Sequence, residues 1–207
     1  MPKVPKVKKV LITFACLLLS PYNGTAGQSG AKAVITGFNA ALLESMKRAD
    51  ELCFAGRFKL LEPVIKNSFA LSFMAEKSVG RYWKTLQEKQ QRLLLETYTG
   101  WSIARYAKNF DGYSGEKFEV LSETEHADGT TIVISRLMVP DEDDIEFYYK
   151  LWKIENKWQI VDIQIEGVSQ LALTRSQCLS VIKNKGFDAL ISSLQKKIKV
   201  LSQEGKK

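Results

Sequence analysis

The chain has 207 residues, with 30 basic and 23 acidic side chains and a net charge of +7. Four of the lysines lie within the first 26 residues, which contain no acid, so the remainder carries a net charge of only +3 and gives little reason to expect nucleic-acid binding. His126 is the only histidine, which leaves no material for a zinc site or a histidine-based catalytic triad.

The N-terminus predicts a cleavable signal sequence over residues 1–26. Residues 1–9 carry the four lysines, Val10–Leu19 is almost wholly apolar, and Gly24–Ala26 provides small residues before a cleavage site. Ten apolar residues are too few to span the roughly 30 Å of membrane hydrocarbon, which argues against an anchor. We therefore expect export of a single domain, residues 27–207, which is long enough to bury a core.

The cysteines predict neither a metal site nor a redox motif. Cys16 lies inside the apolar run of the signal sequence, which disfavours lipidation there. Cys53 and Cys178 are far apart in the chain and lack the spacing of paired ligands. In an oxidising compartment these two could form a disulfide, and the sequence leaves that question open.

Three helical segments are expected in the first part of the domain. Ala31–Met46 has apolar side chains at the spacing of one helix face. A second helix begins near Arg57, with Pro63 in its first turn. A short third segment, Phe73–Val79, is followed by Gly80, which favours a helix C-cap.

A long helix is expected next. Thr85 and Glu88 have the spacing of a capping box, which predicts a helix from there to about Phe110 with a broad, aromatic-rich apolar face. Gly100 inside this helix costs on the order of 1 kcal/mol relative to alanine. A close neighbour packed against Gly100 would explain that choice.

The apolar period then changes from that of a helix to that of strands. Turn-forming residues separate four expected strands, which are Glu116–Ser122, Thr131–Val139, Ile145–Ile154 and Trp158–Glu166. Their short connections predict an antiparallel meander. Because no strand–helix–strand alternation occurs, a parallel nucleotide-binding sheet is excluded.

Two more helices follow the strands. Thr174 and Gln177 have the spacing of a second capping box, and Gly186 ends that helix. The last helix, Phe187–Leu201, is amphipathic.

The expected fold class is therefore α+β. It consists of a four-stranded antiparallel meander of the NTF2-like or cystatin-like type, at about residues 116–167. Helices at about 31–110 and 170–203 pack on the sheet and leave an apolar pocket between the two layers.

Motifs that carry catalysis or metal binding are absent from the sequence. The acidic run Asp141–Asp144 lacks the ligand alternation of a calcium loop and is better interpreted as a solvated hairpin tip. Asp162 lies within an apolar strand, a position at which cone-shaped α+β enzymes can carry a catalytic acid. We favour instead a carboxylate that faces solvent or is held by hydrogen bonds.

Large rings occur on both faces of the third expected strand. Phe147, Tyr148, Tyr149 and Trp152 follow one another there, without the cleaner alternation of a sheet that is buried on one side. Dimer contacts, additional helix packing or an apolar ligand would each account for them. By composition alone an ordinary core comes first and a ligand pocket second.

The segment Trp158–Ser169 resembles the W-x-[VI]-x-D-x-x-x-[ED]-G-[VI]-S motif of the MlaC (toluene-tolerance auxiliary) family. Gly80–Lys84, Tyr113–Gly115 and Lys185–Leu190 match other blocks of that family, in the same order, from about residue 33 to 201. Within the family, Arg57 to Phe69 and Asn109 to Val120 are most similar to the hopanoid-associated HpnM branch. Cys53 and Cys178 are not part of the family pattern.

The resemblance implies a periplasmic, non-enzymatic lipid carrier of an ABC-type transport system that uses no metal, nucleotide or other cofactor. Its cargo would be phospholipid or, alternatively, a hopanoid-type lipid. Its partners would be an inner-membrane MCE-domain complex and an outer-membrane lipoprotein. A less favoured alternative is a small-molecule enzyme that uses Asp162.

The family places acyl chains between the sheet and the helices. The residues that we expect to line this pocket are Leu94, Tyr98, Trp101, Tyr106, Phe147, Tyr149, Leu151 and Trp158. The sequence does not reveal which face of the sheet points inward.

Overall fold

The computed structural model describes residues 30–204, in which helices precede and follow a sheet. The helices are α1 (Ala31–Lys47), α2 (Ala49–Ser68), α3 (Leu71–Val79), the 3-10 helix η1 (Gly80–Thr85), α4 (Glu88–Asn109), α5 (Gln170–Lys185) and α6 (Phe187–Glu204). The predicted signal sequence, residues 1–26, lies outside the described residues. No described helix combines the length and the apolar character that crossing a membrane requires.

The sheet is antiparallel and follows chain order. Its strands are β1 (Lys117–Glu125), β2 (Thr131–Met138), β3 (Ile145–Ile154), β4 (Lys157–Ile165) and β5 (Val168–Ser169). The α+β class and the antiparallel meander are confirmed, but the expected count of four strands is wrong and the NTF2-like or cystatin-like label is not exact. Glu166 and Gly167 have positive φ angles of 51° and 76° and turn β5 back onto β4. Two residues are too few to show an alternation in the sequence.

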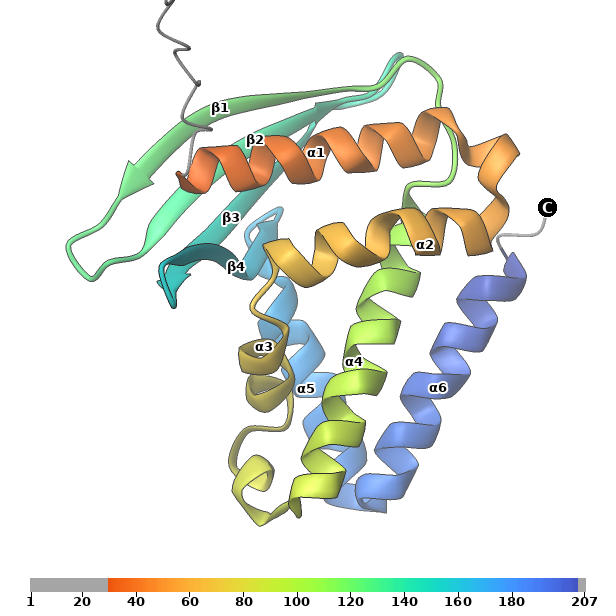
Figure 1. Cartoon of the computed structure of the whole chain (residues 1–207), viewed down its shortest axis with the longest axis vertical. Helices are drawn as coiled ribbons and strands as arrows, with labels where there is room; N and C mark the ends of the chain where they lie inside the picture. The colour runs from red at the N-terminus through yellow and green to blue at the C-terminus, as the bar shows by residue number, and fades with distance from the viewer. Residues whose placement is uncertain (1–29, 205–207) are drawn as a thin grey trace, which may run out of the picture.

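One face of the sheet is covered by helices. The buried side chains of β2 alternate strictly with partly exposed ones, and they are Thr131, Val133, Ser135 and Leu137. The buried side chains of β3 are Phe147, Tyr149 and Leu151. In Figure 1, α1 runs across the sheet and α2 returns beside it in the opposite direction.

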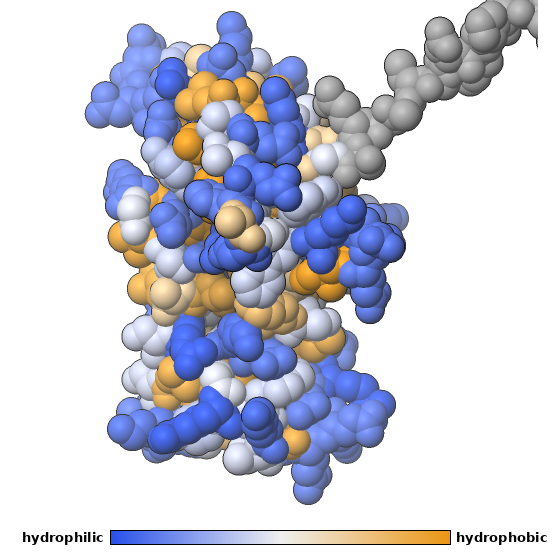
Figure 2. Space-filling view, turned by 90° about the vertical axis from the view of Figure 1, so that its left-hand side faces the viewer, coloured by the Kyte–Doolittle hydropathy of each residue, from blue (hydrophilic) through white to orange (hydrophobic). Residues whose placement is uncertain are grey.

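The rings on the opposite face of β3 have ordinary partners. Tyr148 is exposed, and its hydroxyl donates to a Glu146 carboxylate oxygen at 3.0 Å. The Trp152 ring packs against Phe73 of α3, with 4.9 Å between the ring centroids. Figure 2 views the side of the molecule that carries α3 and the strand ends, where hydrophilic side chains interrupt the apolar ones.

The remaining helices form a bundle that extends away from the sheet. α4 and α6 run roughly perpendicular to α1 and α2, with α3 and α5 beside them (Figure 1). At about 1.5 Å per residue, the 22 residues of α4 extend over about 33 Å. One part of α4 therefore faces the sheet, and the other part faces only helices.

α2 begins earlier than expected. It starts at Ala49, contains a kink at Cys53 (φ 49°, ψ −173°) and carries Pro63 in its interior, so the prediction of a helix that begins near Arg57 is wrong. The kink separates a first turn from the regular part of the helix and hides the start from pattern analysis. Cys53 is exposed, Cys178 is buried in α5, and both thiols are free.

Both predicted capping boxes are displaced. α4 is capped by Gln87 and Gln90, whereas the Thr85 hydroxyl donates to the Tyr82 carbonyl oxygen within η1. α5 begins at Gln170, and the Ser169 hydroxyl accepts from the Ala172 amide at 3.0 Å. The predicted C-caps are confirmed, because α3 ends at Gly80 and α5 at Gly186, both with positive φ.

A buried arginine joins α2 to the end of α4. Arg57 is only 3% exposed. Its Nε donates to the Ala107 carbonyl oxygen and its Nη1 to the Ala49 carbonyl oxygen, both at 2.9 Å. Ala107 lies in the last turn of α4, where carbonyls lack helical partners. Ala49 lies four residues before Cys53, whose amide would be its partner in a regular helix.

Replacing Arg57 should weaken the whole fold. Arg57→Met leaves the two buried carbonyls without donors, so we expect a loss of about 2–4 kcal/mol in the free energy of unfolding. Urea denaturation measures this loss. The matched control is Arg48→Met, which removes exposed ion pairs with Glu44 and Glu51 and should have a much smaller effect. Equal losses of unfolding free energy in the two variants would contradict a stabilising role for the buried hydrogen bonds of Arg57.

Gly100→Ala should stabilise α4. A Cβ at this position would lie 3.6 Å from Ile198 Cδ1, which is ordinary contact, so the expected close neighbour is present but leaves room for a methyl group. We expect a gain of about 1 kcal/mol, or roughly 2–4 °C in Tm. Gly80→Ala is the opposite case, because its φ is +54° and its Cβ would lie 2.7 Å from Arg175 Nη2. Thermal unfolding measures both variants, and a Tm below that of the wild type for Gly100→Ala as well as for Gly80→Ala would contradict this prediction.

Candidate functional site

A partly enclosed hollow lies between the covered face of the sheet and helices α4 and α5. Its volume is about 290 Å³, and we call it the inner cavity. The residues that line it are Leu42, Phe69, Met74, Tyr98, Ser102, Arg105, Tyr106, Asn109, Phe110, Leu137, Ile145, Phe147, Tyr149, Ile163, Ile165, Gln170 and Thr174. Most of these side chains are apolar or aromatic, as in pockets that hold apolar ligands.

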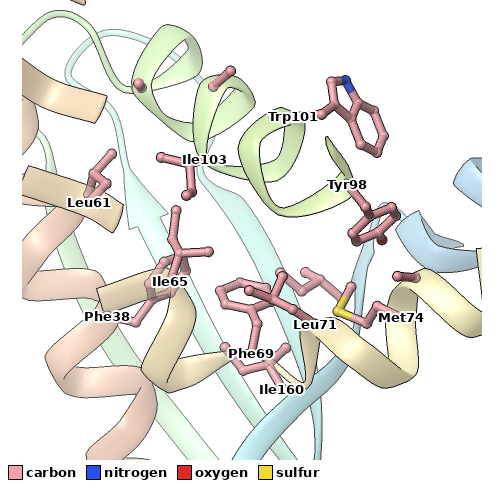
Figure 3. Packing of buried hydrophobic residues seen from close by; sticks show 14 of the residues in the cluster. Phe38, Leu61, Ile65, Phe69, Leu71, Met74, Tyr98, Trp101, Ile103 and Ile160 are labelled. Atoms are coloured by element: carbon pink, nitrogen blue, oxygen red, sulfur yellow. The ribbon is translucent and has the colours of Figure 1, made fainter. Parts of the chain in front are cut away.

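Aromatic rings from α1, α4, β3 and the link between α2 and α3 meet beside the inner cavity. Phe38 of α1 contacts Phe69 edge-on, with 5.1 Å between the ring centroids, and Tyr106 of α4 at 5.2 Å. Phe147 and Tyr149 of β3 stack at 6.0 Å. Figure 3 shows Phe69 lying among Ile65, Leu71 and Met74, on the side of α4 toward which Ile103 points. Such ring pairs are rigid and add about 0.5–1.5 kcal/mol each to area burial.

Polar side chains are confined to one side of the inner cavity. Ser102, Arg105 and Asn109 of α4 and Gln170 and Thr174 of α5 supply them. Arg105 is the sole charged side chain among the described residues that line this cavity. The hollow therefore has an apolar body and one polar, positively charged border.

Three tyrosine hydroxyls lie in the dry interior. Burial raises the pKa of Tyr98 and of Tyr106 well above that of an exposed phenol, although the charge of Arg105 opposes the rise in both. Burial also raises the pKa of Tyr149. The Tyr149 hydroxyl donates to Asn39 Oδ1 at 3.5 Å, and Asn39 Nδ2 donates to Ser135 Oγ at 2.7 Å. The phenols therefore stay neutral at physiological pH and add no charge to the wall.

The structure divides the eight residues that the sequence proposed for the pocket. Tyr98, Tyr106, Phe147 and Tyr149 line the inner cavity. The other four are Leu94, Trp101, Leu151 and Trp158, and none of them lines it.

Each of those four residues packs elsewhere. Leu94 and Leu151 are fully buried in the core, and Trp158 is half-buried against it. Trp101 points away from Ile103 and Ile65 (Figure 3) and borders a separate surface hollow of about 390 Å³, which we call the Trp101 cavity. Leu94 lies on the part of α4 that extends beyond the sheet.

Several lining residues were missed, and one group had a visible signal. Ser102, Arg105 and Asn109 follow Tyr98 at four, seven and eleven residues, which is the spacing of one helix face. The polar border could therefore have been predicted from Tyr98 alone. Phe69 had no such signal, because it lies on the short link between α2 and α3.

A second, more open hollow lies on the other side of Phe69. The α2–α4 groove has a volume of about 880 Å³ and lies between α2, α3, α4 and the turn after β3. Its charged lining residues are Glu62, Lys66, Arg92, Glu96 and Glu155. Phe69 borders both hollows. Mixed charges make this groove a poorer match than the inner cavity for hydrocarbon.

Asp162 is fully engaged in structural hydrogen bonds. Its Oδ1 accepts from the amides of Ile163 at 2.8 Å and Leu171 at 3.0 Å. Its Oδ2 accepts from the Ser169 hydroxyl at 2.6 Å. It lines neither the inner cavity nor the α2–α4 groove. The carboxylate therefore holds the start of α5 against β4.

Metal ligation has no geometric support in the described part of the chain. No three histidine, cysteine, aspartate or glutamate side chains gather there in a way that could hold an ion. The acidic run Asp141–Asp144 is exposed at the tip of the β2–β3 connection, and Asp144 lies 3.6 Å from Arg136.

A family model described as MlaC protein matches residues 38–196. The chain is 26% identical over 144 residues to the intermembrane phospholipid transport system binding protein MlaC of Haemophilus influenzae, covering 65% of this chain and 67% of that protein. Its fold is similar to that of a phospholipid-binding protein from Ralstonia solanacearum solved in complex with a phospholipid. That likeness has a TM-score of 0.73 at 19% identity and covers 83% of this chain and 98% of the other. The family resemblance is confirmed, whereas the hopanoid-associated branch gains no support.

Alkaline pH should destabilise the fold through the buried phenols. In the unfolded chain tyrosine ionises near pH 10, whereas the raised pKa values of Tyr98, Tyr106 and Tyr149 keep these phenols protonated in the fold. Stability should therefore be retained below pH 10 and fall above it, by up to about 1.4 kcal/mol per pH unit for each phenol. Urea denaturation across this range measures the slope.

Two phenylalanine variants make the test specific. Tyr98→Phe should lessen the alkaline slope, whereas Tyr113→Phe, at a residue that is 44% exposed, should leave it unchanged. Phenolate absorbance in which all tyrosines of the folded protein titrate together near pH 10 would contradict the prediction.

Proposed function

Because the chain belongs to the MlaC family, we propose that it is a carrier that binds phospholipid within an intermembrane lipid transport system. The inner cavity is the observation that carries this proposal, since it combines apolar walls with one polar border. The named function of the Haemophilus influenzae relative supports it, as does the phospholipid bound to the Ralstonia solanacearum protein of similar fold.

Hydrocarbon burial supplies the binding energy in this proposal. Each methylene group that leaves water contributes about 0.8 kcal/mol, so one long acyl chain can provide more than a specific polar contact would. The ring faces of Phe147 and Tyr149 and the side chains of Leu137 and Ile163 offer the apolar contact. The three phenols of this wall are neutral at physiological pH, and burial raises their pKa values further above it.

The inner cavity must widen to admit a whole phospholipid. Its volume of about 290 Å³ lies at the small end of ligand pockets, which span about 300–1,000 Å³. The border formed by α4, α5 and Ile145 of β3 is the place at which it can widen, because Ile145 is 38% exposed and Asn109 is exposed. Separation of the helices from the sheet there would leave the meander intact.

Export and the transport partners belong to the same proposal. The predicted signal sequence supports a periplasmic location. An inner-membrane MCE-domain complex and an outer-membrane lipoprotein would then deliver and receive the lipid. Catalysis is not part of this function, because hydrogen bonds occupy both oxygens of Asp162, the single candidate acid.

Phospholipid is the proposed cargo in preference to a hopanoid. The Haemophilus influenzae and Ralstonia solanacearum proteins are phospholipid proteins, and the cavity of this chain has a cation at its polar border. A polycyclic triterpenoid carries no phosphate to meet that cation. Extraction of lipid from the purified protein, followed by mass spectrometry, distinguishes glycerophospholipid from triterpenoid.

Filling the inner cavity should displace lipid. Ser102 is half-buried on the cavity wall, and its hydroxyl donates only to the Tyr98 carbonyl oxygen of its own helix. Ser102→Phe should therefore reduce the lipid-bound fraction several-fold, as measured by native mass spectrometry of protein purified from the periplasm. Ser180→Phe places the same side chain on the exposed surface of α5 and should leave the bound fraction unchanged.

Two results would count against the carrier function. The first is a wild-type protein that is consistently empty after gentle purification. The second is equal lipid loading of the wild type and Ser102→Phe when circular dichroism shows that both are folded.

A further inference from the structure

Arg105 borders two hollows at once. Among the described residues, it is the one charged side chain that lines the inner cavity, and it also lines the Trp101 cavity. The Trp101 cavity adds Lys196 and Lys197 of α6, and no acidic side chain is among the described residues that line it. The two hollows therefore meet at a positively charged junction between α4 and α6.

Among the described residues, no acidic side chain pairs with these cations. No ion pair formed by the described residues includes Arg105, Lys196 or Lys197. The guanidinium carbon of Arg105 lies 4.9 Å from the centre of the Trp101 ring, and the Lys197 ammonium lies 5.5 Å from it. Lys197 also donates to Gln177 Oε1 at 3.1 Å. Two like charges thus flank one indole, an arrangement that an anion would stabilise.

The Arg105 charge also acts inside the inner cavity. Burial raises the pKa values of Tyr98 and Tyr106, and the positive charge of Arg105 opposes the rise at both phenols. The guanidinium is therefore near both rings of the cavity wall. Arg105 is also only half-buried, so its side chain can extend to an anionic group at the mouth of the inner cavity while its backbone stays in α4.

We propose that Arg105, assisted by Lys196 and Lys197, binds the phosphate of the lipid headgroup while the acyl chains occupy the inner cavity. This subsite rests on the phospholipid-binding function proposed above. The planar guanidinium can donate two parallel hydrogen bonds to phosphate oxygens, which an ammonium cannot do in a fixed geometry. The subsite makes the carrier selective for phosphate-bearing lipids over neutral lipids with the same chains.

The charges of the α2–α4 groove set the orientation of the lipid. That groove has three acidic lining residues, Glu62, Glu96 and Glu155, and two basic ones. A phosphate there would meet net negative charge, whereas at Arg105 it meets only cations. The headgroup therefore leaves the inner cavity at its polar border, beside Arg105 of α4.

A pair of lipids that differ only in the phosphate tests the subsite. The protein is incubated with equal amounts of phosphatidic acid and diacylglycerol that carry the same acyl chains, and native mass spectrometry measures the bound ratio. The wild type should prefer phosphatidic acid. Arg105→Gln should lower that preference by about tenfold or more, while diacylglycerol binding remains. Arg105→Lys should retain part of the preference, because it keeps the positive charge but loses the two parallel N–H donors of the guanidinium.

Arg81→Gln is the matched control. Arg81 is also an arginine stacked on an aromatic ring, 5.6 Å from the centre of Tyr82, but it is exposed and lines none of the three hollows. Its replacement should leave the preference unchanged. If Arg105→Gln fails to fold, the Lys197→Gln variant tests the subsite in its place, because it should also lower the preference for phosphatidic acid. The salt dependence of the wild-type preference is the second test, because an electrostatic preference must shrink as ionic strength rises.

The outcomes separate the subsite from the carrier function. A wild type that binds both lipids equally, a preference that salt does not change, or an Arg105→Gln variant that keeps the wild-type ratio would overturn the subsite and leave the carrier function standing. A wild type that binds neither lipid overturns the carrier function itself. Displacement of phosphatidic acid by an equal concentration of inorganic phosphate would identify a free-anion site and overturn the headgroup assignment.

Discussion

The wall of the inner cavity depends on the two hydrogen bonds that Arg57 donates from within the core. They connect the irregular start of α2 to the last turn of α4, and a cation that is 3% exposed has few other ways to be satisfied. α4 carries Arg105 and two of the three cavity phenols, Tyr98 and Tyr106. A single buried guanidinium therefore fastens the C-terminal end of this wall to α2.

The hollow exists because two layers of different shape are joined. α1 runs over the face of the sheet, whereas α4 lies in the helical bundle, roughly perpendicular to α1 and α2, and ends near α2 (Figure 1). The rings of Phe38, Phe69 and Tyr106 close the base of this junction, with Phe38 edge-on to the other two and Phe69 tilted against Tyr106. Rigid rings held at an angle to one another cannot collapse to fill the space as flexible aliphatic chains would. An apolar volume with one cation at its border follows from this packing.

Sequence periodicity predicts the strands well and the site less well. Ile145–Ile154 has the predicted bounds because turn residues flank an unbroken run of strand-forming side chains. The start of α2 could not be predicted, since Arg57 looks like a surface residue and the kink at Cys53 has no sequence signature. Periodicity indicated that Leu94, Tyr98 and Trp101 were apolar positions of one helix. It could not indicate which of them faces the sheet, because that depends on where α4 leaves it.

The Phe69 side chain forms a wall that two of the hollows described above, the inner cavity and the α2–α4 groove, have in common. The same side chain borders the inner cavity and the α2–α4 groove, and its backbone is fastened to the sheet through the Ala70 amide, which donates to the Ile160 carbonyl oxygen at 2.9 Å. The ring is held by contacts with Phe38 and Tyr106, and it is the one described lining side chain that the compartments of about 290 Å³ and about 880 Å³ share. A change in the position of Phe69 would therefore alter both compartments at once, whereas each of the other described side chains that line them belongs to one compartment only.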